Sequence, residues 1–323
     1  MSLFISRRQF FLYTTGAVAA AAFPTVSAKP LRGVFPIMAT PFTAEGTVDF
    51  EDLENETRWL DRCGVQGLVW PQLASEYMTL SKAERLRGME VIARAARNRK
   101  PAVVLGVQGP NTAAALEYVE KAESLAPDAL IAIPPTEAQT PADFVSYYQA
   151  IARAARRPVF IQTTGGTRGV EFPVASILAL AREFENLRYV KEEFEPVIPR
   201  MQELARHRDV IRSVFSGNHG RAMLYEMALG FDGTMPGAAY ADVHAQVWSL
   251  YQAGQRERAR DVFSRLLLMM NVEQQIPGVR RYIMKKRGVF KTTASRREKN
   301  EFSPAEIREI EFQFEALQLY MKV

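Results

Sequence analysis

Short apolar runs rich in β-branched residues alternate with longer amphipathic stretches along most of the chain. Eight of these runs have the length and composition of strands, at 33–37, 67–70, 102–106, 129–133, 159–163, 188–191, 211–216 and 233–235. A helical pattern follows each run, at 50–63, 82–97, 112–125, 141–155, 173–183, 195–206, 221–229 and 242–252. Eight strand–helix pairs in about 220 residues predict a (β/α)8 TIM barrel.

Helix-capping residues lie where this register needs them. Ser81 is followed three residues later by Glu84, as in a capping box, and Thr140 precedes Pro141 at another helix start. An open doubly wound sheet is the alternative architecture, but it would place a glycine-rich phosphate turn after the first strand. The chain has Met-Ala-Thr-Pro-Phe there, at 38–42, so the barrel is favoured.

The strand pattern stops after residue 253. Three helical stretches follow, at 255–270, 273–286 and 304–321. We therefore expect a barrel at 29–253 and a C-terminal three-helix extension at 254–323. A basic segment at 285–299 separates the last two helices. It is either an anion-binding patch or a solvated connector, and charge runs usually remain solvated, which favours the connector.

The first 28 residues differ from the rest because they contain no Asp or Glu. A twin-arginine pattern at 6–11 is followed by a modest apolar stretch to Phe23 and by a small-x-small sequence at 26–28. This order predicts a twin-arginine signal peptide at 1–28, cleavage near Ala28 and a periplasmic mature protein. The apolar stretch is too short for stable membrane insertion. An N-terminal amphipathic helix is the alternative.

Composition excludes several other classes of protein. The chain has 323 residues, 47% of them apolar, which suffices for one large domain. Arg7 and Arg8 are two of 41 basic residues, so cleavage leaves 39 basic and 36 acidic residues. A net charge of +3 does not indicate nucleic-acid binding. Cys63 is the only cysteine and the three histidines are scattered, so neither a disulfide framework nor a metal site is predicted.

The most informative chemical feature is a lysine near the end of the sixth predicted strand. In the sequence Leu-Arg-Tyr-Val-Lys-Glu-Glu at 187–193, strand alternation places Tyr189 and Lys191 on the same side. If that side is the barrel interior, Lys191 loses hydration, which disfavours its ammonium form. A neutral amine can attack a ketone and form a Schiff base. A surface lysine that closes a strand is the alternative.

Several motifs, taken in order, resemble the dihydrodipicolinate synthase/N-acetylneuraminate lyase family over residues 31–320. They are the Thr-Pro-Phe turn at 40–42, Gly-x-x-Asp at 46–49, the strand entry at 64–68, Leu-Ser-x-x-Glu-Arg at 80–85, the strand end at 106–112 and Val-Lys-Glu at 190–192. The resemblance implies that Lys191 forms an imine with a small, pyruvate-like 2-keto acid. It also implies a cofactor-free enzyme and a homo-oligomer, either a dimer or a tetramer.

The chain departs from this family at three positions of the site. Where the family has Gly-Thr-Thr-Gly-Glu after strand two, this chain has Gln-Leu-Ala-Ser-Glu at 72–76. Gln162 stands at the position of the family tyrosine in Tyr-Asn-x-Pro, and Pro-Pro-Thr at 134–136 replaces Pro-Tyr-Tyr. An amide cannot titrate near neutral pH, so the family's proton relay is missing.

These observations predict a lyase or aldolase-type enzyme in which Lys191 and Gln162 are catalytic. The residues predicted to bind the substrate are Ser75, Glu76, Thr163, Thr164, Tyr189 and His219. Glu76, Tyr189 or His219 could replace the missing acid/base. Glu192 and Glu193 are predicted to lie at the N-terminus of the next helix and to complement its dipole, rather than to act as catalysts. The alternative function is an exported keto-acid- or carboxylate-binding protein with little or no turnover.

The targeting prediction can be tested directly. Replacing Arg7 and Arg8 by lysines should hold the protein in the cytoplasm, because twin-arginine export reads the arginine pair. Cell fractionation and N-terminal sequencing of the native protein measure the outcome. Periplasmic accumulation of the double variant, or a native protein that begins at Met1, would contradict the prediction.

Overall fold

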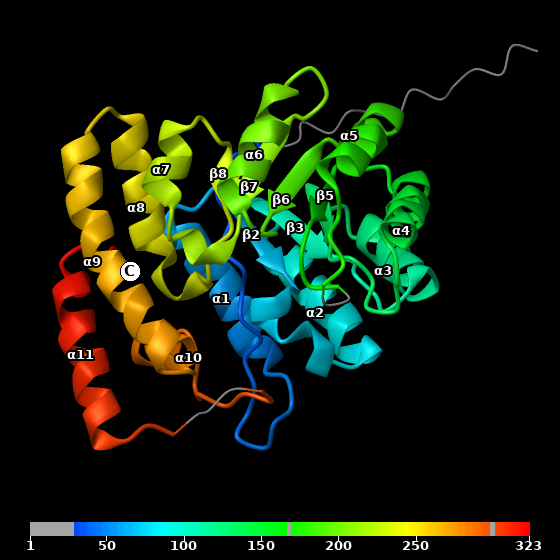
Figure 1. Cartoon of the computed structure of the whole chain (residues 1–323). Helices are drawn as coiled ribbons and strands as arrows, with labels where there is room; N and C mark the ends of the chain where they lie inside the picture. The colour runs from blue at the N-terminus through cyan, green and yellow to red at the C-terminus, as the bar shows by residue number, and fades with distance from the viewer. Residues whose placement is uncertain (1–28, 167–168, 298–300) are drawn as a thin grey trace, which may run out of the picture.

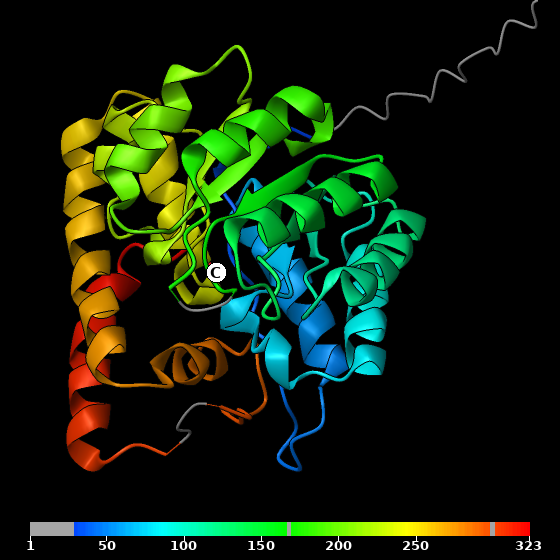
Figure 2. The ribbon, with the colours of Figure 1, turned by 45° about the vertical axis from the view of Figure 1, so that its right-hand side comes forward.

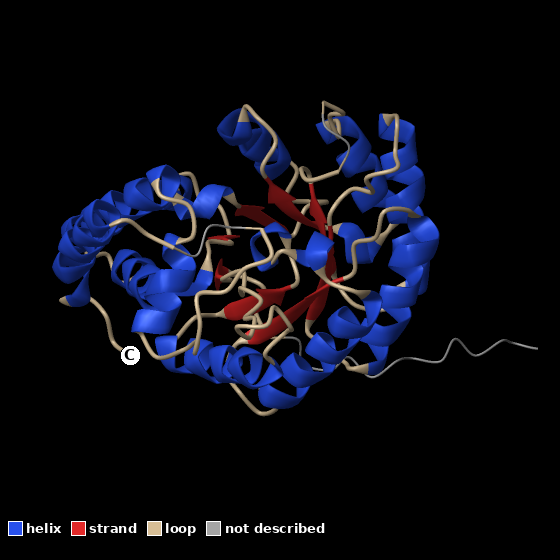
Figure 3. Cartoon of the chain, turned by 90° about the horizontal axis from the view of Figure 1, so that it is seen from below, coloured by secondary structure: helices blue, strands red, loops and turns tan. Residues whose placement is uncertain are grey.

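The computed structural model describes residues 29–166, 169–297 and 301–323, and the predicted signal peptide lies outside them. In these ranges eight parallel strands form one sheet, in the order β1-β8-β7-β6-β5-β4-β3-β2. They are β1 (Gly33–Val34), β2 (Gly67–Trp70), β3 (Ala102–Gly106), β4 (Ala129–Ala132), β5 (Val159–Gln162), β6 (Tyr189–Glu192), β7 (Ser213–Ser216) and β8 (Gly233–Thr234). Figure 3 shows the strands surrounded by helices, which confirms the predicted TIM barrel.

The helices alternate with the strands and then continue beyond them. The barrel helices are α1 (Phe50–Cys63), α2 (Lys82–Ala95), α3 (Thr112–Ser124), α4 (Pro141–Ala154), α5 (Val174–Glu183), α6 (Val197–Arg206), α7 (Met223–Ala228) and α8 (Ala241–Gln252). The extension consists of α9 (Arg256–Gln275), α10 (Val279–Lys286) and α11 (Pro304–Gln318). Helix α9 packs between α8 and α11, so the extension lies against one side of the barrel (Figures 1 and 2).

The barrel closes between its first and second strands around Ile37, where the Val69 N–H donates to the Pro36 carbonyl at 3.0 Å and the Met38 N–H donates to the Val69 carbonyl at 2.9 Å. Ile37 forms parallel bridges with both Val69 and Gly237. The first strand was predicted at 33–37, but its regular part ends at Val34. Pro36 has no N–H to donate, so the ladder is interrupted there before Ile37 resumes it.

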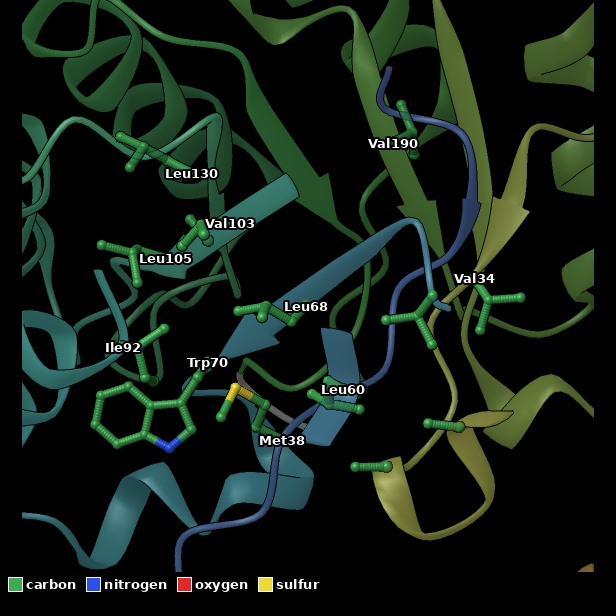
Figure 4. Close-up of a cluster of buried hydrophobic side chains, with 14 of the residues drawn as sticks. Val34, Met38, Leu60, Leu68, Trp70, Ile92, Val103, Leu105, Leu130 and Val190 are labelled. Carbon is green, nitrogen blue, oxygen red and sulfur yellow. The ribbon is translucent and has the colours of Figure 1, made fainter. Parts of the chain in front are cut away.

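Aromatic side chains fill the barrel interior. The ring of Phe215 meets Phe35 and Phe160 edge to face, at centroid distances of 5.1 and 5.3 Å. A second apolar layer lies between the strands and the helices, and Figure 4 shows Leu68 of β2 with Leu60 of α1 in this layer. The barrel is therefore a packed core rather than a pore, and a ligand can bind only at its ends.

The extension differs from its predicted boundaries. Helix α9 continues to Gln275 instead of ending at 270, and α10 begins at Val279 instead of 273. The break falls at Pro277 and Gly278, because proline disfavours helical backbone in the residue before it and Gly278 adopts a positive φ of 88°.

The basic segment is a docking element, so its prediction as a solvated connector is wrong. The side chain of Arg287 is only 4% exposed and pairs with Asp242 of α8 at 2.6 Å. Lys291 pairs with Asp49 at 3.0 Å, and Arg296 pairs with Glu84 at 2.6 Å. These ion pairs connect the end of the chain to α8 and to the segments that follow the first two strands.

No helix among the described residues is both long enough and apolar enough to cross a membrane.

A buried carboxyl of α7, bonded to the last residue of β7, predicts a pH-dependent stability. Burial raises the pKa of Glu226 to about 7, although the Ser216 hydroxyl donates to it. In the unfolded chain the same group ionises near 4.5, so native stability falls as the pH rises from about 4.5 to about 7 and then levels off. Glu226→Gln should remove up to about 3 kcal/mol of this dependence. Urea unfolding between pH 4.5 and 7 measures this dependence. If the free energy of unfolding falls equally with pH in the variant and the wild type, the prediction is contradicted.

Candidate active site

Lys191 lies at the C-terminal end of β6 with its side chain inside the barrel. Its strand neighbour in register is Gln162, the last residue of β5. The Lys191 ammonium Nζ donates to Gln162 Oε1 at 3.4 Å, and the lysine is only 4% exposed. The sequence predicted this position, since β5 and β6 are adjacent and both residues end their strands.

Glu193 is the nearest acidic side chain to this lysine, and its predicted place at a helix N-terminus is wrong. Helix α6 begins only at Val197, so Glu193 is not at a helix N-terminus. Its Oε2 lies 3.2 Å from Lys191 Nζ and accepts a hydrogen bond from Gln162 Nε2 at 2.7 Å. The signal was present in the sequence, because residues two apart on an extended chain face the same side.

The Glu193 carboxylate is held from several directions. The Thr164 hydroxyl donates to Oε2 at 3.2 Å, and the Asn218 N–H donates to Oε1 at 3.4 Å. A Cβ at Gly217 would lie 1.7 Å from Oε1, so only glycine leaves room for the carboxylate. The loops after β5 and β7 therefore fix Glu193 against Lys191.

Lys191, Glu193 and Asn218 line a cavity of about 350 Å³ at the C-terminal end of the barrel. It receives side chains from the loops after several strands and from the extension. The lining residues are Ile37, Gln72, Leu73, Ala74, Glu76, Lys191, Glu193, Asn218, His219, Met235, Gly237, Arg280 and Arg297. Its size and its mixed polar and apolar wall are typical of a small-molecule site.

The wall of this cavity carries three basic side chains, Lys191, Arg280 and Arg297, and two acidic ones, Glu76 and Glu193. Glu76 is bound by Arg281, Glu193 pairs with Lys191, and Arg280 lies 3.6 Å from Glu273. Burial, together with nearby Arg280, Arg221 and Lys191, lowers the pKa of His219 to about 3, so its imidazole is neutral at neutral pH. The arrangement favours an anionic ligand.

The structure brings some of the predicted substrate-binding residues to this cavity. Glu76 and His219 line it, and Thr164 contacts Glu193. Glu76 is held tightly, because it also accepts from the Ser295 hydroxyl at 2.8 Å and the Arg296 N–H at 3.0 Å.

Three predicted residues point elsewhere. The buried Ser75 hydroxyl donates to the Met38 carbonyl and accepts from the Gln72 N–H, so it braces the turn after β2. The Thr163 hydroxyl donates to Glu192, on the side of β6 that faces α6. Tyr189 is at the opposite end of β6 and packs on Phe160 at 5.5 Å. None of the three is among the residues that line the cavity.

Two further lining residues could not be found from the sequence. Arg280 and Arg297 belong to the extension, and only tertiary packing places them above a barrel strand end. In the described ranges no group of three His, Cys, Asp or Glu side chains is arranged to hold a metal ion.

Comparisons with known proteins agree with this architecture. A sequence model described as the dihydrodipicolinate synthetase family matches residues 30–309. A 4-hydroxy-tetrahydrodipicolinate synthase of Chlorobium chlorochromatii is 27% identical over 266 residues, covering 80% of this chain and 88% of that protein. An Escherichia coli protein named "probable 2-dehydro-3-deoxy-D-pentonate aldolase" is also 27% identical, over 65% of this chain and 70% of its own length.

Solved structures share the fold. The dihydrodipicolinate synthase of Rhodopseudomonas palustris superposes with a TM-score of 0.79 and 24% identity, covering 88% of this chain and 97% of that one. The enzyme of Aquifex aeolicus gives 0.80 and 22%, covering 90% and 99%.

The buried pair of Glu76 and Arg281 yields a stability prediction. Their side chains are 3% and 4% exposed, so Glu76→Gln leaves a buried guanidinium without its counter-charge. We expect the free energy of unfolding to fall by about 3–5 kcal/mol. Glu51→Gln is the matched control, because this exposed carboxylate should contribute at most about 1 kcal/mol. Denaturant unfolding measures both variants, and equal effects would show that the pair does not hold the extension.

Proposed function

The chain belongs to the dihydrodipicolinate synthetase family, and from this membership we propose that Lys191 forms a Schiff base with a small 2-keto acid whose reacting end resembles pyruvate. The protein is an aldolase-type enzyme of this family. The protonated imine draws electrons from the neighbouring carbon, which then forms or breaks a C–C bond or loses water.

The position of the Lys191 amine is the observation that carries this proposal. It lies at the C-terminal end of a barrel strand, where ligands of TIM barrels bind, and it faces a cavity of small-molecule size. The amine is almost fully buried, so a bound keto acid would meet it away from bulk water. An exposed lysine would offer neither the enclosure nor the fixed direction of attack.

The charges of the cavity support a carboxylate substrate. Arg280 and Arg297 add two guanidinium groups to the wall, and arginine binds carboxylates through paired N–H donors. The family's threonine hydroxyls are absent at 73 and 74, where this chain has leucine and alanine. We therefore place the substrate's carboxylate toward the arginines of the extension rather than at the turn after β2.

The changes around Lys191 argue against an unaltered family reaction. Gln162 occupies the tyrosine position and its amide is engaged by Glu193 and Lys191. Three parts of the family's proton and carboxylate machinery have changed together, which supports a different second substrate.

The second candidate is a binding protein that captures a keto acid or another carboxylate without turnover. The ion pair between Lys191 and Glu193 favours this reading, because an ammonium group held by a carboxylate cannot attack a ketone. Export to the periplasm and assembly as a homo-oligomer remain further proposals, drawn from the sequence and the family resemblance.

Chemical trapping separates the two functions. We expect sodium borohydride to fix a keto-acid adduct on Lys191 when the protein is incubated with pyruvate, 2-oxobutyrate or 2-oxoglutarate, because only an imine is reduced to a stable amine. Intact-mass and peptide mass spectrometry locate the adduct.

Two variants control this measurement. Lys191→Ala should abolish trapping completely, whereas Lys82→Ala, which removes an exposed lysine of α2, should leave it unchanged. A wild type that binds these acids but forms no adduct would support the binding protein and contradict the enzyme.

A further inference from the structure

We infer that Glu193 is the proton-transfer group of the Lys191 reaction and replaces the missing tyrosine. The inference rests on the proposed Schiff-base function and assigns it a catalytic residue. Glu193 touches the reacting amine directly, since its Oε2 lies 3.2 Å from Nζ. This distance allows a proton to pass between the two groups in one step.

Gln162 connects the proton acceptor to the nucleophile. Its Nε2 donates to Glu193 at 2.7 Å, while its Oε1 accepts from Lys191 at 3.4 Å. An amide cannot transfer a proton near neutral pH, but it can fix the relative position of two groups that do. The glutamine therefore acts as a positioning residue at the place where the family has its acid/base.

The Glu193 carboxylate lines the cavity and is held in its orientation by hydrogen bonds. Its side chain is 19% exposed, so it is partly shielded but still open to a ligand. The bonds from Thr164 and Asn218 hold it from the loops after β5 and β7. Gly217 contributes by having no side chain, because a Cβ would occupy the position of Oε1.

The other acid/base candidates are excluded by their surroundings. Glu76 is held by Arg281 and Ser295, so its carboxylate is already satisfied. His219 has a pKa lowered to about 3, which makes it a weak base at neutral pH. Tyr189 lies at the opposite end of its strand and packs on Phe160. Of the described side chains that line the cavity, Glu193 alone combines an acid/base group with contact to Lys191.

The proton movements balance through this one carboxylate. Glu193 takes a proton from the Lys191 ammonium, and the neutral amine attacks the keto carbon, so a C–N bond forms and the carbonyl π pair moves to oxygen. Glu193 returns its proton to that oxygen and removes one from nitrogen, which gives the neutral carbinolamine. It then protonates the hydroxyl, the C–O bond breaks and water leaves. The products are the iminium, one water and the Glu193 carboxylate in its starting state.

The test measures the rate of imine formation rather than its final extent. Wild type and Glu193→Gln are mixed with the 2-keto acid that the wild type traps fastest, and borohydride is added after increasing delays. We expect Glu193→Gln to form the imine about 10²–10⁴-fold more slowly, because proton transfer is lost while the side-chain shape is kept. Glu195→Gln is the matched control: it removes the same charge two residues further along, from an exposed carboxylate, and should trap at the wild-type rate.

Chemical rescue distinguishes proton transfer from a structural role. Glu193→Ala leaves space beside Lys191, and added formate should restore part of the rate in proportion to its concentration, with no effect on wild type. A Glu193→Gln variant that forms the imine at the wild-type rate would overturn the inference and leave the Schiff base intact. A wild type that traps none of the acids would instead refute the proposed function, and the inference with it.

Discussion

Closure of a parallel sheet is the constraint on which the rest of the molecule depends. Ile37 bridges both Val69 and Gly237, so the first strand joins the second and the eighth. In a closed parallel barrel all C-terminal strand ends lie on one face. Residues as distant in sequence as Gln72 and Gly237 therefore share one cavity. The aromatic side chains packed inside the barrel leave the strand ends and their loops to form the site.

The extension completes this face instead of merely following the barrel. Its buried Arg281 donates to the Thr40 carbonyl at 2.8 Å and pairs with Glu76, so it holds the turns after the first two strands. The adjacent Arg280 reaches the cavity wall from the same helix. Arg281, which holds the extension, and Arg280, which lines the cavity, are neighbours in α10. A change that loosens the extension would therefore also change the shape of the site.

The site keeps the lysine of its family but surrounds it with other groups. A tyrosine at the end of β5 would carry its own proton, whereas Gln162 needs a partner that can titrate. In the proposed reaction this partner is Glu193, which directly follows β6, the strand that bears the lysine. The lysine and the carboxylate form an ion pair, so in the proposed reaction a proton must pass from the ammonium to Glu193 before the amine can attack.

The barrel, the position of Lys191 beside Gln162 and the three terminal helices could all be predicted from the amino-acid sequence. Those features follow from hydrophobic periodicity and strand order, which are local or nearly so. The sequence misplaced Glu193, because helix α6 begins only at Val197, four residues further along the chain than this glutamate. Only the tertiary structure brought Arg280 and Arg297 to the cavity, turned Thr163 toward Glu192 and used Ser75 to brace a turn. These outcomes depend on contacts between segments far apart in the chain, and periodicity carries no information about such contacts.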